Sequence, residues 1–355
     1  MMRQPTTPQD NAPFLNSHGT RGGLPLQLAR PFKIIAFDWD GTAVLHRRED
    51  ATCLRALVEK LLRLGVSVII ITATAFPNIE QQLTAGLRSP HKHNLYVSTN
   101  RGSEVYGFDA QSQPVLLWQR LATREESRLL AEIVHVAGEA VVARTGLEIR
   151  VVDDRMNRGK LDLMPLPARH DPPKSAMGEV QQAVEARLKG AGLSNGLQEV
   201  LQLVEQTALE KGLRGARLTT DAKQVEVGLT DKSDAMDWLI RELARGLNVA
   251  PEHMLIAGDE FGPIAGLEGS DHKMVTLQAM KAMFVSVGAE PWGTPPEVMH
   301  LGGGPARFRA LLAHQVALLE RLHRPLTLGV VPKADRRNPA GPLPSPPPPL
   351  RSLPV

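Results

Sequence analysis

Short apolar segments that alternate with amphipathic helical segments are the strongest constraint on the fold of this 355-residue chain. Strand-like residues cover Lys33–Asp38 and Val66–Thr72, and helical leucine spacing covers Asp50–Leu64 between them. A helical stretch at Asn78–Leu87 and a third strand at Asn94–Ser98 follow. Strands joined by helices pair in parallel, so the pattern predicts an α/β fold whose parallel sheet carries helices on both faces.

The same alternation returns late in the chain, whereas the middle has a different pattern. Asp234–Arg245 is predicted as a helix, Met254–Ala257 and Met283–Val287 as strands, and Ala306–Leu322 as the last helix. The middle mixes three helical stretches with strands at Glu148–Asp153 and Gln224–Gly228. We therefore expect a Rossmann-like core from residues 31–103 and 229–330, interrupted by an inserted α+β domain at residues 104–228.

The two ends of the chain lack this periodicity. Residues 1–30 mix polar residues with Pro and Gly, and are predicted to form a disordered leader. Residues 331–355 hold nine of the 28 prolines and are predicted to form a disordered, extended tail. The tail either docks on a proline-binding module or is simply solvated, and the composition favours solvation.

Charge and cysteine content exclude several classes of function. The net charge of +3 and the pI near 9.1 arise in the two ends, because residues 31–330 carry two more acids than bases. The sequence therefore gives no support for a nucleic-acid partner. A single cysteine, Cys53, excludes internal disulfides, and no apolar run is long enough for a membrane span. We expect a protein of the cytoplasm with no membrane partner.

Polar residues stand where the predicted strands end. In an open α/β sheet these positions lie together at one edge, where ligands bind. Asp38, Asp40, Thr72 and Asp259 stand at such strand ends, and Lys232 precedes the helix that leads into the strand before Asp259. Carboxylates are the ligands that Mg²⁺ prefers, and a lysine offsets charge on a phosphoryl group. One carboxylate can act as nucleophile and the next as general acid and base, while the Gly41 turn can cradle phosphate with its backbone N–H groups.

These residues carry a family resemblance. Phe37–Val44 (FDWDGTAV) resembles the first signature of the haloacid dehalogenase (HAD) superfamily of phosphotransferases. Thr72, Lys232 and the segment Leu255–Glu260 resemble the second, third and fourth signatures, in the right order. The resemblance covers about residues 31–290. It implies a Mg²⁺-dependent phosphatase in which Asp38 is the nucleophile and a metal ligand, and Asp40 is the general acid and base.

The same resemblance implies roles for the remaining residues. Asp40 would bind the metal through its backbone carbonyl, Thr72 and Lys232 would hold the phosphoryl group, and Asp259 would bind Mg²⁺. Asp271 is the candidate second acid of the fourth signature and would support the Mg²⁺ site, although it lies 12 positions after Asp259, farther than in relatives. Glu260 is the alternative for that duty.

The inserted domain narrows the resemblance to the capped subclass IIB. Ser98–Tyr106 resembles the segment that opens the cap, except that Arg101 separates Asn100 from Gly102. Asp153–Pro165 resembles a cap segment of phosphomannomutase-like members, which implies that Arg155 and Arg158 bind the substrate. The alternative is a charged hairpin face balanced by neighbouring aspartates.

Three functions remain open at this point. The residues favour hydrolysis of a small phosphorylated metabolite, with a sugar phosphate as the substrate that the resemblance implies. A phosphohexomutase uses the same core chemistry but needs a second phosphate site in the cap. A non-catalytic scaffold that uses the proline-rich tail is the third possibility, and the complete set of aspartates argues against it.

Overall fold

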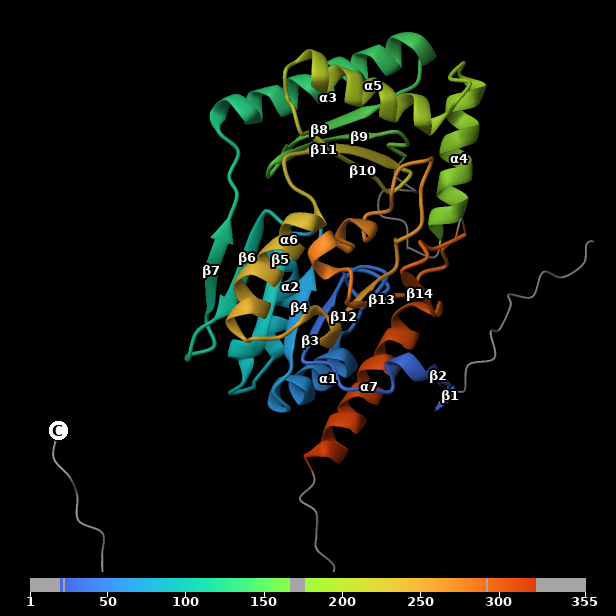
Figure 1. Ribbon diagram of the computed structural model, residues 1–355. Coiled ribbons are helices and arrows are strands. Elements are labelled where there is room, and N and C mark those ends of the chain that lie inside the picture. The colour runs from blue at the N-terminus through green and yellow to red at the C-terminus, as the bar shows by residue number, and fades with distance from the viewer. Residues whose placement is uncertain (1–19, 22, 167–175, 292, 324–355) are drawn as a thin grey trace, which may run out of the picture. The chain divides into compact units, whose positions relative to one another are not determined.

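A large sheet forms the centre of the protein in the computed structural model, which describes residues 20–21, 23–166, 176–291 and 293–323 (Figure 1). Its eight strands lie in the order β14-β13-β12-β3-β4-β5-β6-β7. The six parallel strands are β3 (Ile34–Phe37), β4 (Ser67–Ile71), β5 (Leu95–Thr99), β12 (Met254–Gly258), β13 (Met283–Ser286) and β14 (Val298–His300). The α/β fold and the parallel sheet predicted from the alternation are confirmed.

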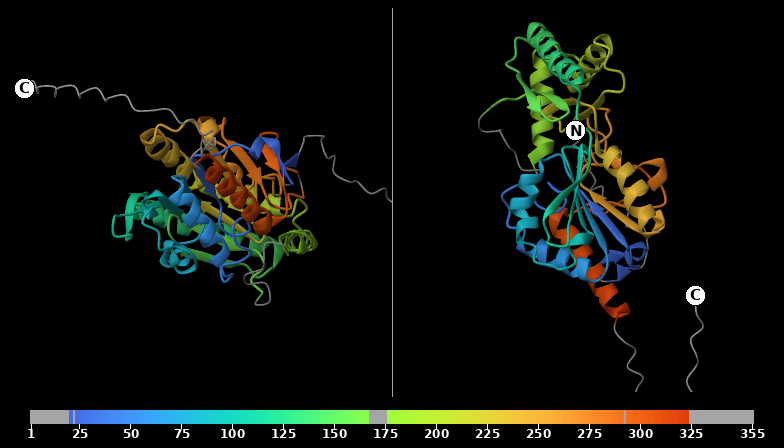
Figure 2. Two further views of the ribbon diagram at one scale, coloured as in Figure 1. Left: turned by 90° about the horizontal axis from the view of Figure 1, so that it is seen from below. Right: turned by 90° about the vertical axis from the view of Figure 1, so that its left-hand side faces the viewer.

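Helices cover both faces of this sheet (Figure 2). On one face, α1 (Thr52–Arg63) and α7 (Gly304–Leu322) pack on Ile35 and Phe37 of the central strand. The intervening residues Ile34 and Ala36 point to the opposite face, because side chains alternate along a strand. There they meet α6 (Lys232–Trp238) and the π-helical turn that continues it, Leu239–Ala244. Another helix, α2 (Phe76–Gln82), follows β4.

The inserted domain begins later than predicted. Residues 104–119 fold as a hairpin of β6 (Glu104–Phe108) and β7 (Pro114–Gln119), which extends the large sheet antiparallel to β5. The predicted boundary at residue 104 is therefore wrong. A hairpin looks the same in sequence whichever sheet it joins, since its partner strand is chosen by contacts far along the chain.

A second, four-stranded antiparallel sheet follows the hairpin, in the order β10-β11-β9-β8. We call residues 120–228 the cap. Its strands are β8 (Arg150–Arg155), β9 (Arg158–Asp162), β10 (Arg217–Thr220) and β11 (Gln224–Gly228). Three helices, α3 (Arg124–Thr145), α4 (Met177–Gly190) and α5 (Leu197–Glu210), share an apolar core with these strands. The capping box of Thr123 and Glu126 begins α3.

Part of the predicted leader is folded. Thr20–Arg21 and Leu24–Pro25 form the short strands β1 and β2, and a 3₁₀ turn follows at Leu26–Leu28. Leu24 and Leu28 are buried in the main core. The side chain of Gln315 on α7 donates to the carbonyl oxygens of Leu28 and Arg30, at 2.9 and 3.1 Å. The prediction of disorder is therefore wrong for residues 23–30, because two leucines and a buried amide supply contacts that composition does not reveal.

The other parts of the two ends lie outside the described residues. These are residues 1–19 of the predicted leader and the whole of the predicted proline-rich tail. Within the parts of the chain that the structure describes, no helix is long and apolar enough to cross a lipid bilayer.

The remaining 3₁₀ turns are Thr84–Gly86, Lys92–Asn94, Pro251–His253, His272–Met274 and Leu277–Ala279.

Candidate active site

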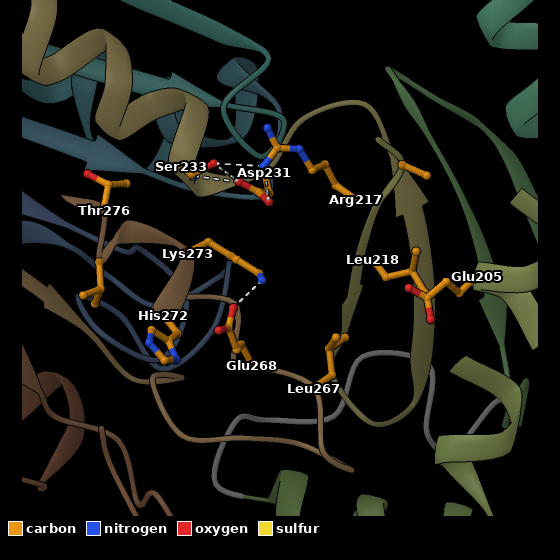
Figure 3. Close-up of a pocket in the computed structure, with 12 residues that line it drawn as sticks. Glu205, Arg217, Leu218, Asp231, Ser233, Leu267, Glu268, His272, Lys273 and Thr276 are labelled. Atoms are coloured by element: carbon orange, nitrogen blue, oxygen red, sulfur yellow. Dashed lines mark hydrogen bonds and ion pairs between the residues drawn. The ribbon is translucent and has the colours of Figure 1, made fainter. Parts of the chain in front are cut away.

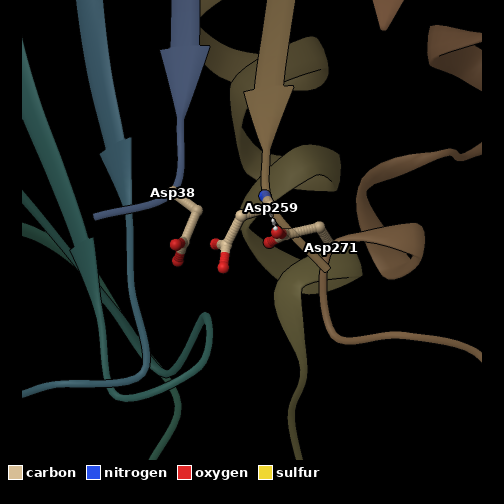
Figure 4. A group of neighbouring side chains, drawn as sticks. All are labelled: Asp38, Asp259 and Asp271. Atoms are coloured by element: carbon tan, nitrogen blue, oxygen red, sulfur yellow. Dashed lines mark hydrogen bonds between the residues drawn. The ribbon is translucent and has the colours of Figure 1, made fainter. Parts of the chain in front are cut away.

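Three carboxylates meet at the carboxyl ends of two neighbouring strands (Figure 4). Asp38 directly follows β3, Asp259 directly follows β12, and the two strands pair in parallel from Met254–Ile34 to Ala257–Phe37. Asp271 reaches the same place from the loop after β12. One carboxylate oxygen from each residue lies within 4.8 Å of the other two. The sheet register therefore brings together two aspartates that are far apart in the sequence.

Lys232 joins two of these carboxylates. Its ammonium group donates to Oδ1 of Asp38 at 2.5 Å and also to Oδ1 of Asp271. The lysine is 3% exposed and Asp271 is 1% exposed, so solvent screens this contact only weakly. Burial alone would lower the pKa of Lys232, but the carboxylates of Asp271 and Asp38 outweigh burial and hold that pKa above its usual value. Lys232 is therefore a fixed positive charge beside Asp38.

Backbone N–H groups hold Asp271 in its position. Its Oδ2 accepts hydrogen bonds from the N–H groups of Asp259 at 2.7 Å and Glu260 at 2.8 Å. A side chain at Gly258 would put its Cβ 2.4 Å from that same oxygen, so glycine makes room for the carboxylate. Burial disfavours the charge, but Lys232 and the two N–H donors together keep the pKa of Asp271 below its usual range. The loop between Asp259 and Asp271 thus returns to the end of β12 and brings the two aspartates together, although they are 12 positions apart in the sequence.

The turn after Asp38 is shaped for close approach. Gly41 has φ = +93°, which favours glycine, and a Cβ there would lie 2.2 Å from Oδ2 of Asp259. The hydroxyl of Thr42 lies 3.3 Å from Oδ2 of Asp38 and 3.0 Å from Oδ1 of Asp259. The turn therefore links the two strand-end aspartates, and sequence reasoning had not assigned Thr42 a role.

Asp40 lies apart from the three grouped carboxylates. Its side chain is 19% exposed, and Oδ2 lies 3.6 Å from Nε of Arg47. Oδ1 is buried and accepts no hydrogen bond from any described residue. Trp39, between the two aspartates, is fully buried and donates to the side chain of Gln82 at 2.8 Å, so it anchors this segment to α2. The Oδ1 atom of Asp40 can therefore accept a proton, or a hydrogen bond from a donor on a bound molecule.

Thr72 stands at the end of β4, the other neighbour of β3. It is 1% exposed, and its hydroxyl accepts from the N–H of Thr74 at 3.2 Å. Because β3 and β4 pair in parallel from Ile34–Ser67 to Phe37–Ile70, Asp38 and Thr72 leave the sheet at the same edge. The backbone N–H of Arg101 donates to the carbonyl of Thr72 at 3.0 Å.

The two predicted cap arginines have different surroundings. Arg155 is exposed, and its nearest charged partner is Asp154 at 3.7 Å. Arg158 is 7% exposed and donates to the carbonyl of Ala73, the residue after Thr72, at 2.8 Å. Its Nε and Nη1 are buried and have no hydrogen-bond partner among the described residues. Burial, together with nearby arginines, lowers the pKa of Arg158 to about 10. The structure thus brings Arg158, but not Arg155, to the core.

A buried carboxylate in the cap gathers three cations that sequence reasoning did not connect. Glu226 of β11 accepts from Nε of Arg101 at 2.7 Å and pairs with Nζ of Lys160 at 2.6 Å. Nη1 of Arg158 lies 3.8 Å from it. Alternation along β11 predicts that Glu226 and Gln224 lie on the same face of the strand, but it does not show which residues Glu226 contacts. Arg101 lies in a loop of the core, and Arg158 and Lys160 lie on β9, so no local sequence pattern identifies these partners.

Asn157 fixes the turn between β8 and β9 to the segments that enter and leave the cap. Its side chain donates to Oγ of Ser103 at 2.9 Å and to the carbonyl of Arg120, and accepts from the N–H of Ala122 at 2.8 Å. Its carbonyl accepts from the N–H of Leu229 at 2.9 Å. Asn157 has φ = +58°, a conformation that asparagine tolerates better than most residues.

A separate cavity of about 380 Å³ lies between β10 and the start of α6 (Figure 3). Its cations have carboxylate partners: Arg217 pairs with Asp231 at 3.2 Å, and Lys273 with Glu268. The sequence-predicted site residues do not line it. The grouped aspartates, and not this cavity, therefore form the candidate active site.

Comparisons with known proteins agree with the fold. No protein-family model matches the chain, and no curated protein matches it. An IMP-nucleotidase of Plasmodium falciparum, solved with IMP bound, superposes with a TM-score of 0.54 at 12% identity. That match covers 82% of this chain and 70% of the other. A trehalose-6-phosphate phosphatase of Aspergillus fumigatus gives a TM-score of 0.47 at 14% identity, over 82% and 96% of the two chains.

The superposition with the IMP-nucleotidase shows that this chain shares the fold of that protein.

The charges around Glu226 predict a pH-dependent stability. Burial disfavours the charged form of Glu226, but Arg101, Arg158 and Lys160 hold its pKa well below the ordinary value of 4.5. Glu226→Gln leaves three cations without their carboxylate, and should lower the free energy of unfolding at pH 7 by about 3–5 kcal/mol. Because the pKa is depressed in the folded state, this difference should be complete above pH 4.5 and shrink as the pH falls below it.

Urea unfolding of both proteins from pH 7 down to pH 3.5 measures the difference. Glu132→Gln, which removes a half-buried carboxylate from α3, is the control and should show no comparable loss. A difference between wild type and Glu226→Gln that stays constant over this range would contradict the assignment.

Proposed function

We propose that this protein is a Mg²⁺-dependent phosphatase that hydrolyses a small phosphorylated metabolite, with sugar phosphates as its substrate class. The observation that carries the proposal is the buried ammonium of Lys232, held between Asp38 and Asp271 at the ends of β3 and β12. A phosphoryl group brought to Asp38 meets a fixed positive charge there, and such charges stabilise the transition state of phosphoryl transfer.

The reaction proceeds in two steps. An oxygen of Asp38 attacks phosphorus, the bond to the leaving oxygen breaks, and Asp40 gives that oxygen a proton. This forms an aspartyl-phosphate and releases the alcohol. Water then attacks the phosphorus, Asp40 takes a proton from that water, and inorganic phosphate leaves while the Asp38 carboxylate is restored. The unpartnered Oδ1 of Asp40 suits a group that carries a proton in both steps.

The donor atoms fit Mg²⁺, which prefers oxygen ligands. We assign Asp38, Asp259 and the backbone carbonyl of Asp40 as ligands. Asp271 lies in the same group and is the further candidate ligand, and it also holds Lys232 and accepts from the N–H of Asp259. When bound, the ion supplies positive charge that offsets the charge on the phosphoryl oxygens. Thr72 contacts the phosphoryl group from the protein side. The N–H groups of Gly41, Ala43 and Val44 donate within the turn, so Gly41 acts on the phosphoryl group through the shape of the turn.

The leaving group lies toward the cap. Arg158 supports this, because it contacts the carbonyl of Ala73, the residue that follows Thr72, and its buried Nε and Nη1 have no hydrogen-bond acceptor among the described residues, Nη1 being paired only at 3.8 Å with Glu226. A sugar hydroxyl or anionic oxygen on the leaving group satisfies these donors. The comparison protein named an IMP-nucleotidase extends the set of substrates to test to nucleoside monophosphates. We place the protein in the reducing cytoplasm, where its single cysteine, the exposed Cys53, remains a thiol.

Removing the nucleophile tests the proposal. Asp38→Asn should lower the rate of phosphate release by at least about a thousandfold, because the amide cannot form the aspartyl-phosphate. Asp40→Asn should be nearly inactive as well. The measurement is Mg²⁺-dependent phosphate release over a panel of sugar phosphates and nucleoside monophosphates, with circular dichroism to show that each variant is folded.

The panel also distinguishes the remaining alternatives. Conversion of a hexose 1-phosphate to its 6-phosphate isomer without net phosphate release would indicate a mutase, in which Arg158 binds the second phosphate. Full activity in Asp38→Asn contradicts the nucleophile assignment. No release of phosphate from any member of the panel would favour a non-catalytic role.

A matched pair of glycine variants tests the geometry of the turn. Gly41→Ala should abolish most phosphatase activity, because its Cβ would displace Oδ2 of Asp259. Gly65→Ala places alanine at a similar φ of +80°, but a Cβ there meets no atom within 4 Å. Both variants should be destabilised by about 1 kcal/mol or more. Steady-state kinetics and thermal melting measure the two effects, and equal activities in the two variants would contradict the role of the turn.

The two cap arginines form a second matched pair. Arg158→Met should raise KM for the best substrate of the panel at least tenfold, because it removes the buried donors that face the leaving group. Arg155→Met, which removes an exposed arginine three residues away, should leave KM within twofold. Arg158→Lys serves if the methionine variant does not fold. If both arginine variants keep the wild-type KM, the assignment of Arg158 fails.

A further inference from the structure

Arg101 stands in an unusual stretch of backbone between the large sheet and the cap. Asn100, Arg101 and Gly102 follow β5 with φ values of +50°, +57° and +82°. The left-handed region costs a residue with a side chain about 1–3 kcal/mol, so other contacts must hold Arg101 there. A Cβ at Gly102 would lie 2.3 Å from the carbonyl oxygen of Asp231, so this loop also lies against the residue before Lys232.

Arg101 contacts three parts of the molecule. Its backbone N–H donates to the carbonyl of Thr72 at 3.0 Å. Its Nε donates to Glu226 in the cap at 2.7 Å, and its Nη1 donates to Oγ of Ser270 at 3.1 Å. Ser270 immediately precedes Asp271, the carboxylate that holds Lys232. One side chain thus links the cap sheet to the loop that completes the candidate active site.

The burial of this guanidinium depends on the cap. Arg101 is 8% exposed, and removing a charged group from water is costly unless a partner of opposite charge meets it. Glu226 is its ion-pair partner among the described residues, and Glu226 belongs to the cap. When Nε of Arg101 is bonded to Glu226, the planar guanidinium is oriented so that its Nη1 reaches Oγ of Ser270. The position of the Asp271 loop is therefore tied to the seating of the cap.

We propose that Arg101 is a positioning residue that couples seating of the cap to assembly of the phosphoryl site. The effect on turnover that this proposal predicts rests on the phosphatase function proposed above, whereas its effect on the structure does not. Arg101 touches none of the reacting groups. It acts through Ser270 on the loop of Asp271, and hence on Lys232 and Asp38. An ion pair that served stability alone would raise the melting temperature without altering turnover in the folded protein.

The test compares Arg101→Met with a matched control, Lys223→Met. Lys223 is a buried cation that pairs with Asp162 at 2.7 Å, but both residues lie within the cap. Hydrolysis of para-nitrophenyl phosphate with Mg²⁺ measures kcat and KM. Arg101→Met should lower kcat about 10–100-fold with little change in KM, the usual size of effect for residues that orient those doing the chemistry. Lys223→Met should lower the melting temperature but keep kcat within twofold. Arg101→Lys, which reaches one partner at a time, should be intermediate.

A second readout does not depend on catalysis. Amide hydrogen exchange over residues 268–274, measured without Mg²⁺ or substrate, should be at least tenfold faster in Arg101→Met than in wild type, and unchanged in Lys223→Met. If wild type hydrolyses no phosphate ester, the proposed function fails, and the exchange comparison alone decides the role of Arg101. Wild-type exchange in folded Arg101→Met overturns the proposal, as does wild-type kcat in an active enzyme. If Arg101→Met does not fold, Arg101→Lys is judged by the same two readouts.

Discussion

The buried ammonium of Lys232, shared between Asp38 and Asp271, is the interaction on which the rest of the site depends. A lone charge at this depth would be too costly, so each partner must be held where it cancels the others. Asp38 is held by β3, and Asp271 by two backbone N–H groups at the end of β12. Gly258 leaves the space that Asp271 occupies, and Gly41 leaves the space that Asp259 occupies. The chain thus places a buried contact between charged groups at the point where phosphorus is proposed to react.

Sequence reasoning anticipated the parts of this arrangement that follow local rules. A buried apolar strand ending in a polar residue can be recognised from a few neighbours, which is why Asp38, Thr72 and Asp259 were placed at one edge of a parallel sheet. The core strands of the large sheet and the helices on its two faces follow from the same alternation. Lys232 was placed at the same edge because it precedes the helix that leads into β12. The family resemblance added Asp271, and the structure shows how a loop closes the long separation of Asp271 from Asp259.

Contacts between distant segments were beyond the reach of such rules. The hairpin of β6 and β7 joined the large sheet, although its sequence fits either sheet. Leu24 and Leu28 are buried in the core, although the sequence around them predicts disorder. Their segment is held by the side chain of Gln315, which lies 287 residues away from Leu28, so the leader alone does not reveal this contact. Arg101 was visible only as an extra residue between Asn100 and Gly102. Its partner Glu226 lies 125 residues farther along the chain, and nothing local to either residue predicts the pair.

The central claim is that Asp38 becomes phosphorylated during turnover. Quenching the protein during reaction with para-nitrophenyl phosphate and Mg²⁺, then reducing it with borohydride, converts an aspartyl-phosphate to homoserine. Peptide mass spectrometry should find homoserine at position 38, and none in protein incubated without phosphate ester. Rapid release of phosphate with Asp38 unchanged, or with the reduced residue elsewhere in the chain, would contradict the account.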